Sequence, residues 1–336
     1  MLYELPAVEH FDVKSVKEAI SCLRQNGEKA RVIAGGTDLL GLMKDRIEGP
    51  QLKIPEVLIN IKAIPELHQV TYDPKAGLRI GAAVTLSQLE YSEVINKRFP
   101  ILSQAARQVG ATQLRNMGTI GGNICQRPRC LYFRHPHFPC YKKGGDKCYA
   151  AAGEHRYYHA ILKHGKCVMA CPSDMSPALM ALQGQALING REGEKTLPLQ
   201  EFFLGPNSFT ETALKSDEIL AQLVVPDQKW THQVFLKHRI RHSSDFSLAS
   251  VAMVARISDG TCMEIRIVLG GVAPFPYIAF KAEEVVRGKE LSDQVISQAA
   301  EASVEEARPL PMNRYKIDLT RALVRRVLTS IQCSAY

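Results

Sequence analysis

The sequence lacks a segment that is long and apolar enough to cross a membrane. Its 336 residues contain no run of 18 or more apolar residues, which is about the length that a bilayer-spanning helix needs. The first six residues also lack the basic and apolar regions of a secretory signal. These absences predict a cytoplasmic protein without a membrane partner.

Two common nucleotide-binding signatures are also missing. The chain contains neither the three spaced glycines of a dinucleotide-binding fingerprint nor the Gly-Lys-Ser end of a P-loop. It shows no recognised nucleic-acid-binding motif either, although its formal net charge is +8. We therefore expect no nucleic-acid partner.

The excess positive charge is concentrated in one segment, residues 125–171. This segment holds nine Lys and Arg against two Asp and Glu, and it contains six of the nine cysteines and five histidines. It has no clear helical or strand period, so metal–thiolate bonds are a candidate for what organises it. The charge fits a solvated loop, a basic shell around an anionic iron–sulfur cluster, or a docking face for an acidic redox partner.

Two glycine pairs are candidates for a cofactor site. Residues 30–34 predict a buried strand that runs into Gly35-Gly36-Thr37-Asp38, with a short helix from Leu39. Such a connection exposes N–H groups and can cradle an anion, although a tight turn with an Asp cap has the same residues. The second stretch, residues 119–125, reads Thr-Ile-Gly-Gly-Asn-Ile-Cys. Its Gly-Gly-Asn turn is predicted to offer bare N–H groups to an anion or a flat ring edge.

The remaining periodic segments predict a mixture of helices and strands. Helices are predicted over residues 13–25, 39–44, 100–109, 172–183, 279–287, 293–307 and 319–328, with another capped by Thr85. Strands are predicted over residues 30–34, 57–61, 78–83, 186–191, 218–225, 234–239 and 263–272. A boundary near Asp227 divides the chain into residues 1–226 and residues 227–336.

Five motifs in register resemble the FAD subunits of the xanthine dehydrogenase family. They are Ala34–Leu40, Thr119–Ile124, Asp174 before Pro177-Ala178-Leu179, Leu269–Pro274, and Tyr315-Lys316 through Arg325-Arg326. The resemblance covers nearly the whole chain and implies an α+β fold. An FAD-binding domain of the vanillyl-alcohol-oxidase/CO-dehydrogenase flavoprotein type, with two subdomains, is expected over residues 1–226. A small α+β C-terminal domain is expected over residues 227–336.

The resemblance also implies which residues contact FAD. Residues 33–40 are expected to hold the pyrophosphate, residues 119–123 the flavin end, and Asp174 is expected to be a polar contact. The full expected set is Ile33, Ala34, Gly35, Gly36, Thr37, Asp38, Leu39, Leu40, Val109, Thr119, Ile120, Gly121, Gly122, Asn123, Asp174, Leu220 and Lys237. No residue is expected to act as a general acid or base, because the flavin itself carries the electrons.

The cysteine-rich segment is a long insertion relative to ordinary members of that family. It resembles the insertion of the β subunits of 4-hydroxybenzoyl-CoA reductases, which carries a [4Fe–4S] cluster. The implied ligands are Cys130, Cys140, Cys148 and Cys167, with Cys125 as the alternative to Cys130 and with Cys171 spare. Their gaps of 10, 8 and 19 residues match neither compact ferredoxin spacing nor the close pairs of zinc sites, so the spacing leaves both metals open.

The implied function is electron transfer in a molybdenum hydroxylase-type oxidoreductase. The chain is expected to carry FAD and [4Fe–4S] beside a large molybdenum-cofactor subunit and a small subunit with [2Fe–2S] clusters. A dimer of such heterotrimers is expected, with a ferredoxin-like external carrier and with the substrate bound in another subunit. One alternative is the FAD subunit of an NAD-dependent xanthine or aldehyde dehydrogenase with a zinc-stabilised docking loop. Another is a stand-alone redox or assembly protein.

Overall fold

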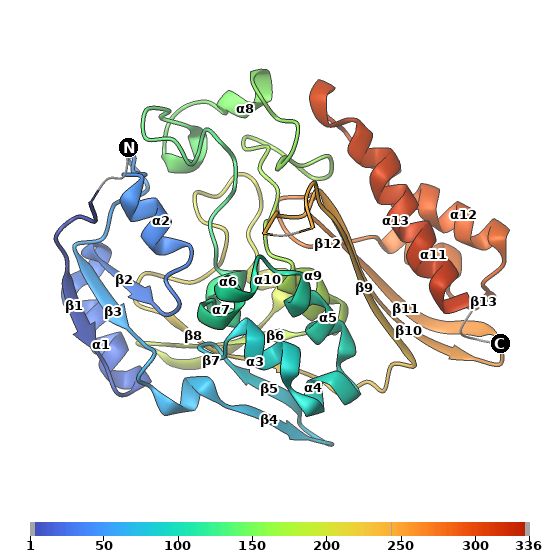
Figure 1. Cartoon of the computed structure of the whole chain (residues 1–336), viewed down its shortest axis with the longest axis horizontal. Coiled ribbons are helices and arrows are strands. Elements are labelled where there is room, and N and C mark those ends of the chain that lie inside the picture. The colour runs from blue at the N-terminus through green and yellow to red at the C-terminus, as the bar shows by residue number, and fades with distance from the viewer. Residues whose placement is uncertain (1–3, 243, 333–336) are drawn as a thin grey trace.

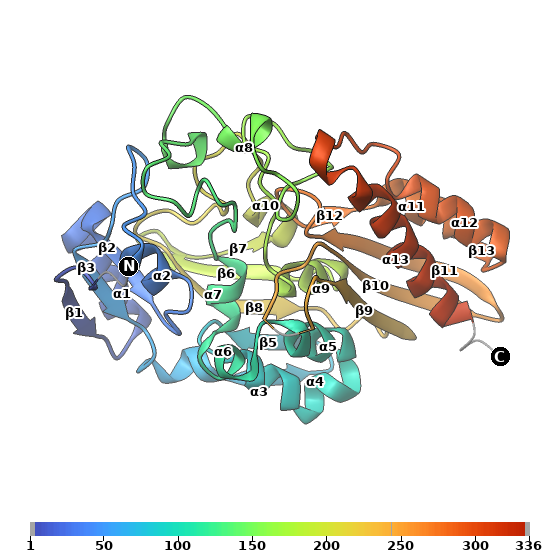
Figure 2. The ribbon, with the colours of Figure 1, turned by 45° about the horizontal axis from the view of Figure 1, so that its top comes forward.

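Three sheets and the helices around them build the molecule (Figure 1). The computed structural model describes residues 4–242 and 244–332. The N-terminal sheet is parallel, and the central and C-terminal sheets are antiparallel. The central sheet lies between the other two in both views (Figure 1, Figure 2).

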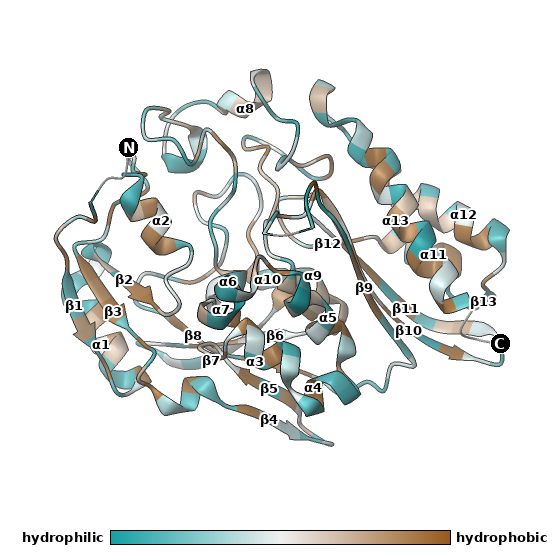
Figure 3. Cartoon of the chain, viewed as in Figure 1, coloured by the Kyte–Doolittle hydropathy of each residue, from teal (hydrophilic) through white to brown (hydrophobic). Residues whose placement is uncertain are grey.

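The N-terminal sheet positions the first glycine pair. Its strands run in the order β1 (Glu9–Asp12), β3 (Val57–Asn60) and β2 (Ala30–Ile33). Figure 3 shows that β2 and β3 are largely apolar. Helix α1 (Val16–Asn26) is capped by Ser15, whose hydroxyl accepts a hydrogen bond from the Glu18 N–H. Ala19 and Leu23 of this helix pack between the N-terminal and central sheets.

The central sheet anchors both the second glycine pair and the cysteine insertion. Its strand order is β4 (Val70–Asp73), β5 (Gly77–Gly81), β8 (Ile219–Val225), β6 (Gln185–Gly190) and β7 (Gly193–Pro198). Strand β8 pairs with both β5 and β6. Between β5 and β6 in the sequence, residues 82–184 leave this sheet and return to it. Helices of that excursion share its apolar core, namely α3 (Leu86–Tyr91), α4 (Glu93–Arg98), α5 (Pro100–Gln108) and α9 (Met175–Ala181).

The C-terminal sheet is covered on both faces. Its strands are β12 (Tyr277–Ile278), β11 (Thr261–Gly270), β10 (Ala249–Ser258) and β9 (His232–His238), with β13 (Lys289–Glu290) paired to β11. Side chains alternate between the faces of a strand, so Ala252 and Val254 of β10 join the central core while Val251 and Met253 face the other way. The helices on that second side are α11 (Phe280–Val286), α12 (Asp293–Ala302) and α13 (Tyr315–Gln332).

The cysteine insertion, residues 125–171, bridges the two ends of the molecule with little regular structure of its own (Figure 2). All of it is described, and its only helical segments are a 3₁₀ turn at Tyr141–Lys143 and helix α8 (Tyr149–Ala152). On one side the Gln51 N–H donates to the Lys143 carbonyl at 2.9 Å. On the other side the buried Lys316 ammonium donates to the His159 carbonyl at 3.0 Å.

The architecture is the α+β fold that the sequence predicted, and most predicted elements lie within a few residues of their expected bounds. The predicted short helix over residues 39–44 is α2 (Leu39–Lys44). Further short helices occur at α6 (Thr112–Met117), α7 (Ile120–Ile124) and α10 (Leu199–Phe202). The prediction of a turn at residues 119–125 is wrong, because Thr119 caps helix α7 there. Helix α12 ends at Ala302, before residue 307, and α13 begins earlier than predicted. Among the described residues, no helix combines the length and apolar character that crossing a membrane requires.

Candidate cofactor sites

Two pockets meet to form one elongated cleft beside the glycine pairs. One has about 960 Å³ of empty volume and the other about 800 Å³. We call the first the β2 pocket, because residues 31–39 line it, and the second the Lys237 pocket, because Lys237 lines it. Both are lined by Thr37, Asp38, Thr119, Gly122 and Gln126.

The backbone requires glycine at both positions of the first pair, Gly35 and Gly36. Gly36 has φ +68°, a conformation that favours glycine. A Cβ on Gly35 would lie 2.0 Å from the Met117 carbonyl oxygen, so only glycine allows that close approach. Within the described residues, the N–H groups of residues 35–38 donate to no protein acceptor. The turn therefore offers the free amides that the sequence predicted there.

The second glycine pair behaves differently. The Gly122 N–H donates to the Thr119 hydroxyl at 3.1 Å, and the Gly121 N–H donates to the Ala82 carbonyl at 2.9 Å. The prediction of bare N–H groups here is therefore wrong, since the cap and the end of β5 supply acceptors. A Cβ on Gly121 would lie 2.8 Å from the Ala82 oxygen. These glycines let α7 pack closely against the end of β5 while Gly122 faces the cleft.

A buried ion pair forms one wall of the Lys237 pocket. Lys237 Nζ lies 2.6 Å from Asp174 Oδ2 and donates to the Gln108 carbonyl at 3.0 Å. The side chains of Lys237 and Asp174 are 0% and 3% exposed. Burial raises the pKa of Asp174, and the charge of Lys237 opposes that rise. A buried charge pair in a pocket wall is typical of a polar cofactor contact.

The structure brings most of the predicted FAD contacts together on this cleft. Those that line it are Ile33, Ala34, Gly35, Gly36, Thr37, Asp38, Leu39, Val109, Thr119, Gly122, Asn123, Asp174 and Lys237. Four predicted contacts line neither pocket. Leu40 packs against Gly36, Ile120 and Gly121 are buried in α7, and Leu220 is buried in the core on β8.

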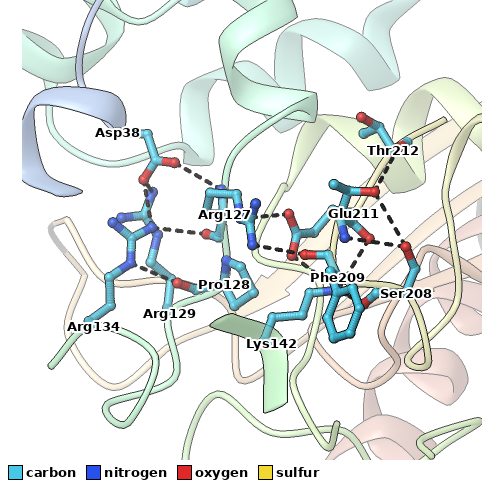
Figure 4. A network of polar contacts seen from close by, with 11 residues as sticks. Asp38, Arg127, Pro128, Arg129, Arg134, Lys142, Ser208, Phe209, Glu211 and Thr212 are labelled. Carbon is cyan, nitrogen blue, oxygen red and sulfur yellow. Dashed lines mark hydrogen bonds and ion pairs between the residues drawn. The ribbon is translucent and has the colours of Figure 1, made fainter. Parts of the chain in front are cut away.

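The first residues of the insertion also line the cleft, which the sequence did not predict. Gln126, Arg127 and Arg129 face it. The Asp38 carboxylate accepts from the Arg127 N–H at 2.8 Å and pairs with Arg129 at 2.8 Å and Arg134 at 2.7 Å (Figure 4). Burial opposes ionisation of Asp38, but these arginines outweigh it and lower the pKa of Asp38. The basic excess of the insertion was the only sequence signal for this arrangement.

The charged contacts continue from the cleft toward the cysteines. The Arg127 side chain lies 2.8 Å from Glu211, and Glu211 lies 3.2 Å from Lys142 (Figure 4). Lys142 is 1% exposed and donates to the carbonyls of Ser208 and Thr210. These cations are therefore internal, and the interpretation of the segment as a freely solvated loop does not hold for them.

The four predicted cluster ligands line a single small cavity, which we call the cysteine cavity. It is surrounded by Cys130, Cys140, Cys148 and Cys167, together with aromatic and aliphatic side chains, and its empty volume is about 280 Å³. The two other cysteines of the insertion lie elsewhere. Cys125 lines the β2 pocket, and the Cys171 sulfur lies 3.6 Å from the Ser176 hydroxyl. Four thiols on one cavity are a donor set that suits an iron–sulfur cluster or zinc.

Two further side chains lie near the sulfurs of this cavity. His159 Nε2 lies 3.2 Å from Cys130 Sγ. The buried Lys143 donates to the His135 carbonyl at 2.7 Å and lies close enough to Cys140 and Cys130 to interact with their charge. Burial raises the pKa of Cys130 to about 11, so a bound cation would be needed to hold it as a thiolate at neutral pH. Among the described residues, no three His, Cys, Asp or Glu side chains are gathered around the position of one metal ion.

Known families match both parts of the chain. A family described as the FAD binding domain in molybdopterin dehydrogenase matches residues 6–228, and the CO dehydrogenase flavoprotein C-terminal domain matches residues 234–331. The chain is 32% identical over 325 residues to the aldehyde oxidoreductase FAD-binding subunit PaoB of Escherichia coli, covering 94% of this chain and 95% of that protein. It is 29% identical over 331 residues to the carbon monoxide dehydrogenase medium chain of Hydrogenophaga pseudoflava, covering 97% of each.

A solved structure agrees with these sequence matches. The carbon monoxide dehydrogenase of Hydrogenophaga pseudoflava contains a chain that matches with a TM-score of 0.77 and 28% identity, covering 97% of both chains. The shared fold and the family matches agree along nearly the full length of the chain. Both glycine pairs lie within the residues that the FAD-binding family matches. The chain therefore belongs to the FAD-binding medium subunits of the molybdenum hydroxylase family, the oxidoreductase family of the xanthine and CO dehydrogenases.

Proposed function

We propose that this chain is an electron-transfer subunit that holds FAD in the cleft and a [4Fe–4S] cluster in the cysteine cavity. One observation carries the proposal: residues 126–129 separate the two cavities. Gln126, Arg127 and Arg129 line the cleft, whereas Pro128 lines the cysteine cavity. FAD in the cleft and a cluster in the cysteine cavity would lie on opposite sides of residues 126–129, so electrons would need no further carrier between them.

The cleft suits an extended FAD. The free N–H groups of residues 35–38 suit the pyrophosphate, and the apolar Leu42, Met43 and Ile47 of the β2 pocket suit the adenine. The flavin end is assigned to the Lys237 pocket, where Val109, Asn123 and Asp174 also lie. Leu40, Ile120, Gly121 and Leu220 are assigned a supporting role behind these walls. When bound, FAD exchanges one or two electrons, so it can link a two-electron reaction to one-electron clusters.

The cysteine cavity suits a cluster with four thiolate ligands. Lys142 lines the cavity and Lys143 lies beside it, so two buried cations offset the negative charge of the thiolates. Cys125 and Cys171 lie outside the cavity, which supports Cys130 as the first ligand. In a [4Fe–4S] cluster each of the four irons binds one thiolate, so the four cysteine sulfurs lie farther apart than the ligands of a single ion. This agrees with the described residues, among which no three ligand side chains are gathered around the position of one ion.

The proposed complex follows from the family. We infer a large molybdenum-cofactor subunit and a small [2Fe–2S] subunit as partners, in a dimer of heterotrimers, with a ferredoxin-like external carrier, as in 4-hydroxybenzoyl-CoA reductase. The similar proteins are described as a FAD-binding subunit and a medium chain, which supports a multi-subunit complex. Residues 1–226 are proposed as the FAD-binding domain and residues 227–336 as the C-terminal domain.

The test is a cofactor analysis of the complex purified without oxygen. We expect one FAD and about four irons per chain in addition to those of the small subunit, and a cysteine-dependent paramagnetic signal on reduction. Cys130→Ser should lose the extra iron, and Cys125→Ser should keep it as the matched control. Iron loss in the Cys125 variant alone would overturn the ligand assignment.

A zinc-stabilised docking loop is the second candidate, in an NAD-linked enzyme. It is favoured by the closeness of Cys148 and Cys167, since Cys167 lowers the pKa of Cys148 while Cys148 raises the pKa of Cys167, and neighbouring thiols are typical of a single-ion site. One zinc per chain in place of the four irons, together with reduction of NAD by the complex, would establish this alternative.

A further inference from the structure

Arg129 belongs to the cysteine insertion, yet its side chain lines the Lys237 pocket of the cleft. Its Nη2 lies 2.8 Å from Asp38 Oδ1 (Figure 4). The same nitrogen donates to Gln126 Oε1, also at 2.8 Å. The guanidinium carbon lies 4.4 Å from the ring centre of Phe246. Contacts from three separate parts of the chain therefore fix this cation on the wall of the cleft.

The Arg129 guanidinium also has an unused donor. Its Nε is buried and forms no hydrogen bond with any described residue. Burial lowers the pKa of Arg129 to about 10, while the charge of Asp38 opposes the decrease, so the side chain is charged at neutral pH. A buried charged donor without a partner costs free energy until a ligand or water satisfies it. The Nε itself is enclosed, but the side chain as a whole is 19% exposed and lines the pocket, so the positive charge of Arg129 faces any ligand bound there.

Asp38 explains why a cation is needed at this place. Its carboxylate lies where the two pockets meet, and by itself it would repel the phosphates of a dinucleotide. Arg129 and Arg134 both pair with it, so the three side chains together carry a net positive charge. Arg129 lines the cleft, whereas Arg134 lines neither pocket. The two arginines therefore share one partner but differ in their access to a bound cofactor.

We propose that Arg129 is a cofactor-binding residue that the insertion contributes to the FAD site. Its fixed positive charge strengthens FAD binding and favours reduction of the flavin, because reduced flavin carries more negative charge. Asp38, Gln126 and Phe246 act through it as positioning residues. The inference rests on the proposed placement of FAD in this cleft, and it makes the insertion part of the flavin site as well as the proposed holder of metal.

The test compares Arg129→Met, Arg129→Lys and Arg134→Met in the purified complex. The readouts are the FAD dissociation constant and the midpoint potential of the flavin, with thermal unfolding as the folding control. Arg129→Met should weaken FAD binding about tenfold or more, since a charge-assisted hydrogen bond is lost, and should make the flavin potential more negative. Arg129→Lys should recover part of both changes, because it keeps the charge. Arg134→Met should leave the FAD dissociation constant within about twofold of wild type and should shift the flavin potential less than Arg129→Met does, since this arginine lines neither pocket.

Equal changes in the Arg129→Met and Arg134→Met complexes would overturn the inference, because they would assign Arg129 a structural role only. An unchanged flavin potential in Arg129→Met would overturn it as well. Gly36→Val tests the placement of FAD separately, since φ +68° at that position disfavours any side chain. Wild-type FAD binding by Gly36→Val would refute the placement itself. Loss of FAD in Gly36→Val, with equal behaviour of the two arginine variants, would refute only the role of Arg129.

Discussion

The glycine-lined cleft and the cysteine cavity lie on either side of residues 126–129, but the chain builds them in different ways. The cleft is walled by β2 and α7, which also contribute to the main apolar clusters. The cavity is walled by residues 128–169, whose only helical segments are one 3₁₀ turn and the four-residue helix α8. The sheets and helices of the fold therefore shape the cleft, whereas the cavity depends on the bonds that organise the insertion.

Three buried lysines lie in or beside the insertion, in addition to a small apolar cluster that includes Phe133 and Val168. Lys142, Lys143 and Lys316 are each at most 1% exposed. Their ammonium groups donate to backbone carbonyls, including those of Ser208, His135 and His159. Buried charges are tolerated when they are fully hydrogen-bonded, but they stabilise less than apolar packing of the same volume. The insertion is therefore the region expected to open first when its ligands are removed.

Removal of one proposed metal ligand has the largest expected effect. Bound metal can contribute on the order of 10 kcal/mol, and the apolar cluster of the insertion is small beside those of the sheets. In Cys148→Ser, we expect hydrogen exchange to accelerate across residues 128–169, while the central sheet keeps its protection. Cys22→Ser is the control, because Cys22 lines neither cavity. Equal loss of protection in both regions would contradict the contrast between them.

Breaking the buried ion pair is the next largest perturbation, and it acts on the cleft. Lys237→Met leaves Asp174 charged and unpaired, which typically costs about 3–5 kcal/mol. Burial raises the folded pKa of Asp174, so the folded state binds a proton more tightly than the unfolded state. Stability of the variant should therefore be highest below the unfolded pKa and fall as the pH rises through the folded pKa.

Urea unfolding at several pH values measures this dependence. The double variant Asp174→Asn/Lys237→Met is the control, because it removes the buried charge along with its partner. It should recover part of the stability and lose the pH dependence. A single variant with the same pH dependence as the double variant would show that Asp174 binds protons equally well in the folded and unfolded states, which would contradict the expected rise in its folded pKa.

These two regions also differ in how far the sequence revealed them. The first glycine pair was predictable, because positive φ at Gly36 and the close approach of Met117 to Gly35 demand one residue type. The arginine contacts were missed, because Asp38 lies 89 residues before Arg127 and no local pattern links them. The helix at α7 was missed because its turns depend on the Ala82 carbonyl, which belongs to another part of the chain.

Gly35→Val tests whether the cleft is shaped by the fold and not by the insertion. The new Cβ would lie 2.0 Å from a backbone oxygen, and overpacking of this kind costs about 1–3 kcal/mol. We expect loss of FAD absorbance, with iron content unchanged. Gly41→Ala in α2 is the matched control, since a Cβ there meets nothing within 4 Å, and it should add up to about 1 kcal/mol of stability. Iron loss in Gly35→Val would mean that the two sites are coupled more tightly than their separate walls suggest.

The smallest effect is expected from Thr85→Ala, which removes a helix cap at the edge of the Lys237 pocket. The Thr85 hydroxyl accepts from the Gln88 N–H at 3.2 Å, and its loss should cost about 1 kcal/mol of unfolding free energy. Leu86, which lines the pocket, is also held by a bond from its N–H to the Gly118 carbonyl at 2.9 Å. FAD affinity should therefore stay within about twofold of wild type, and Thr85→Ser should restore the stability. A loss of FAD as large as that in Gly35→Val would show that the walls of the cleft do not act independently, because a cleft shaped by many separate contacts should weaken only in small steps.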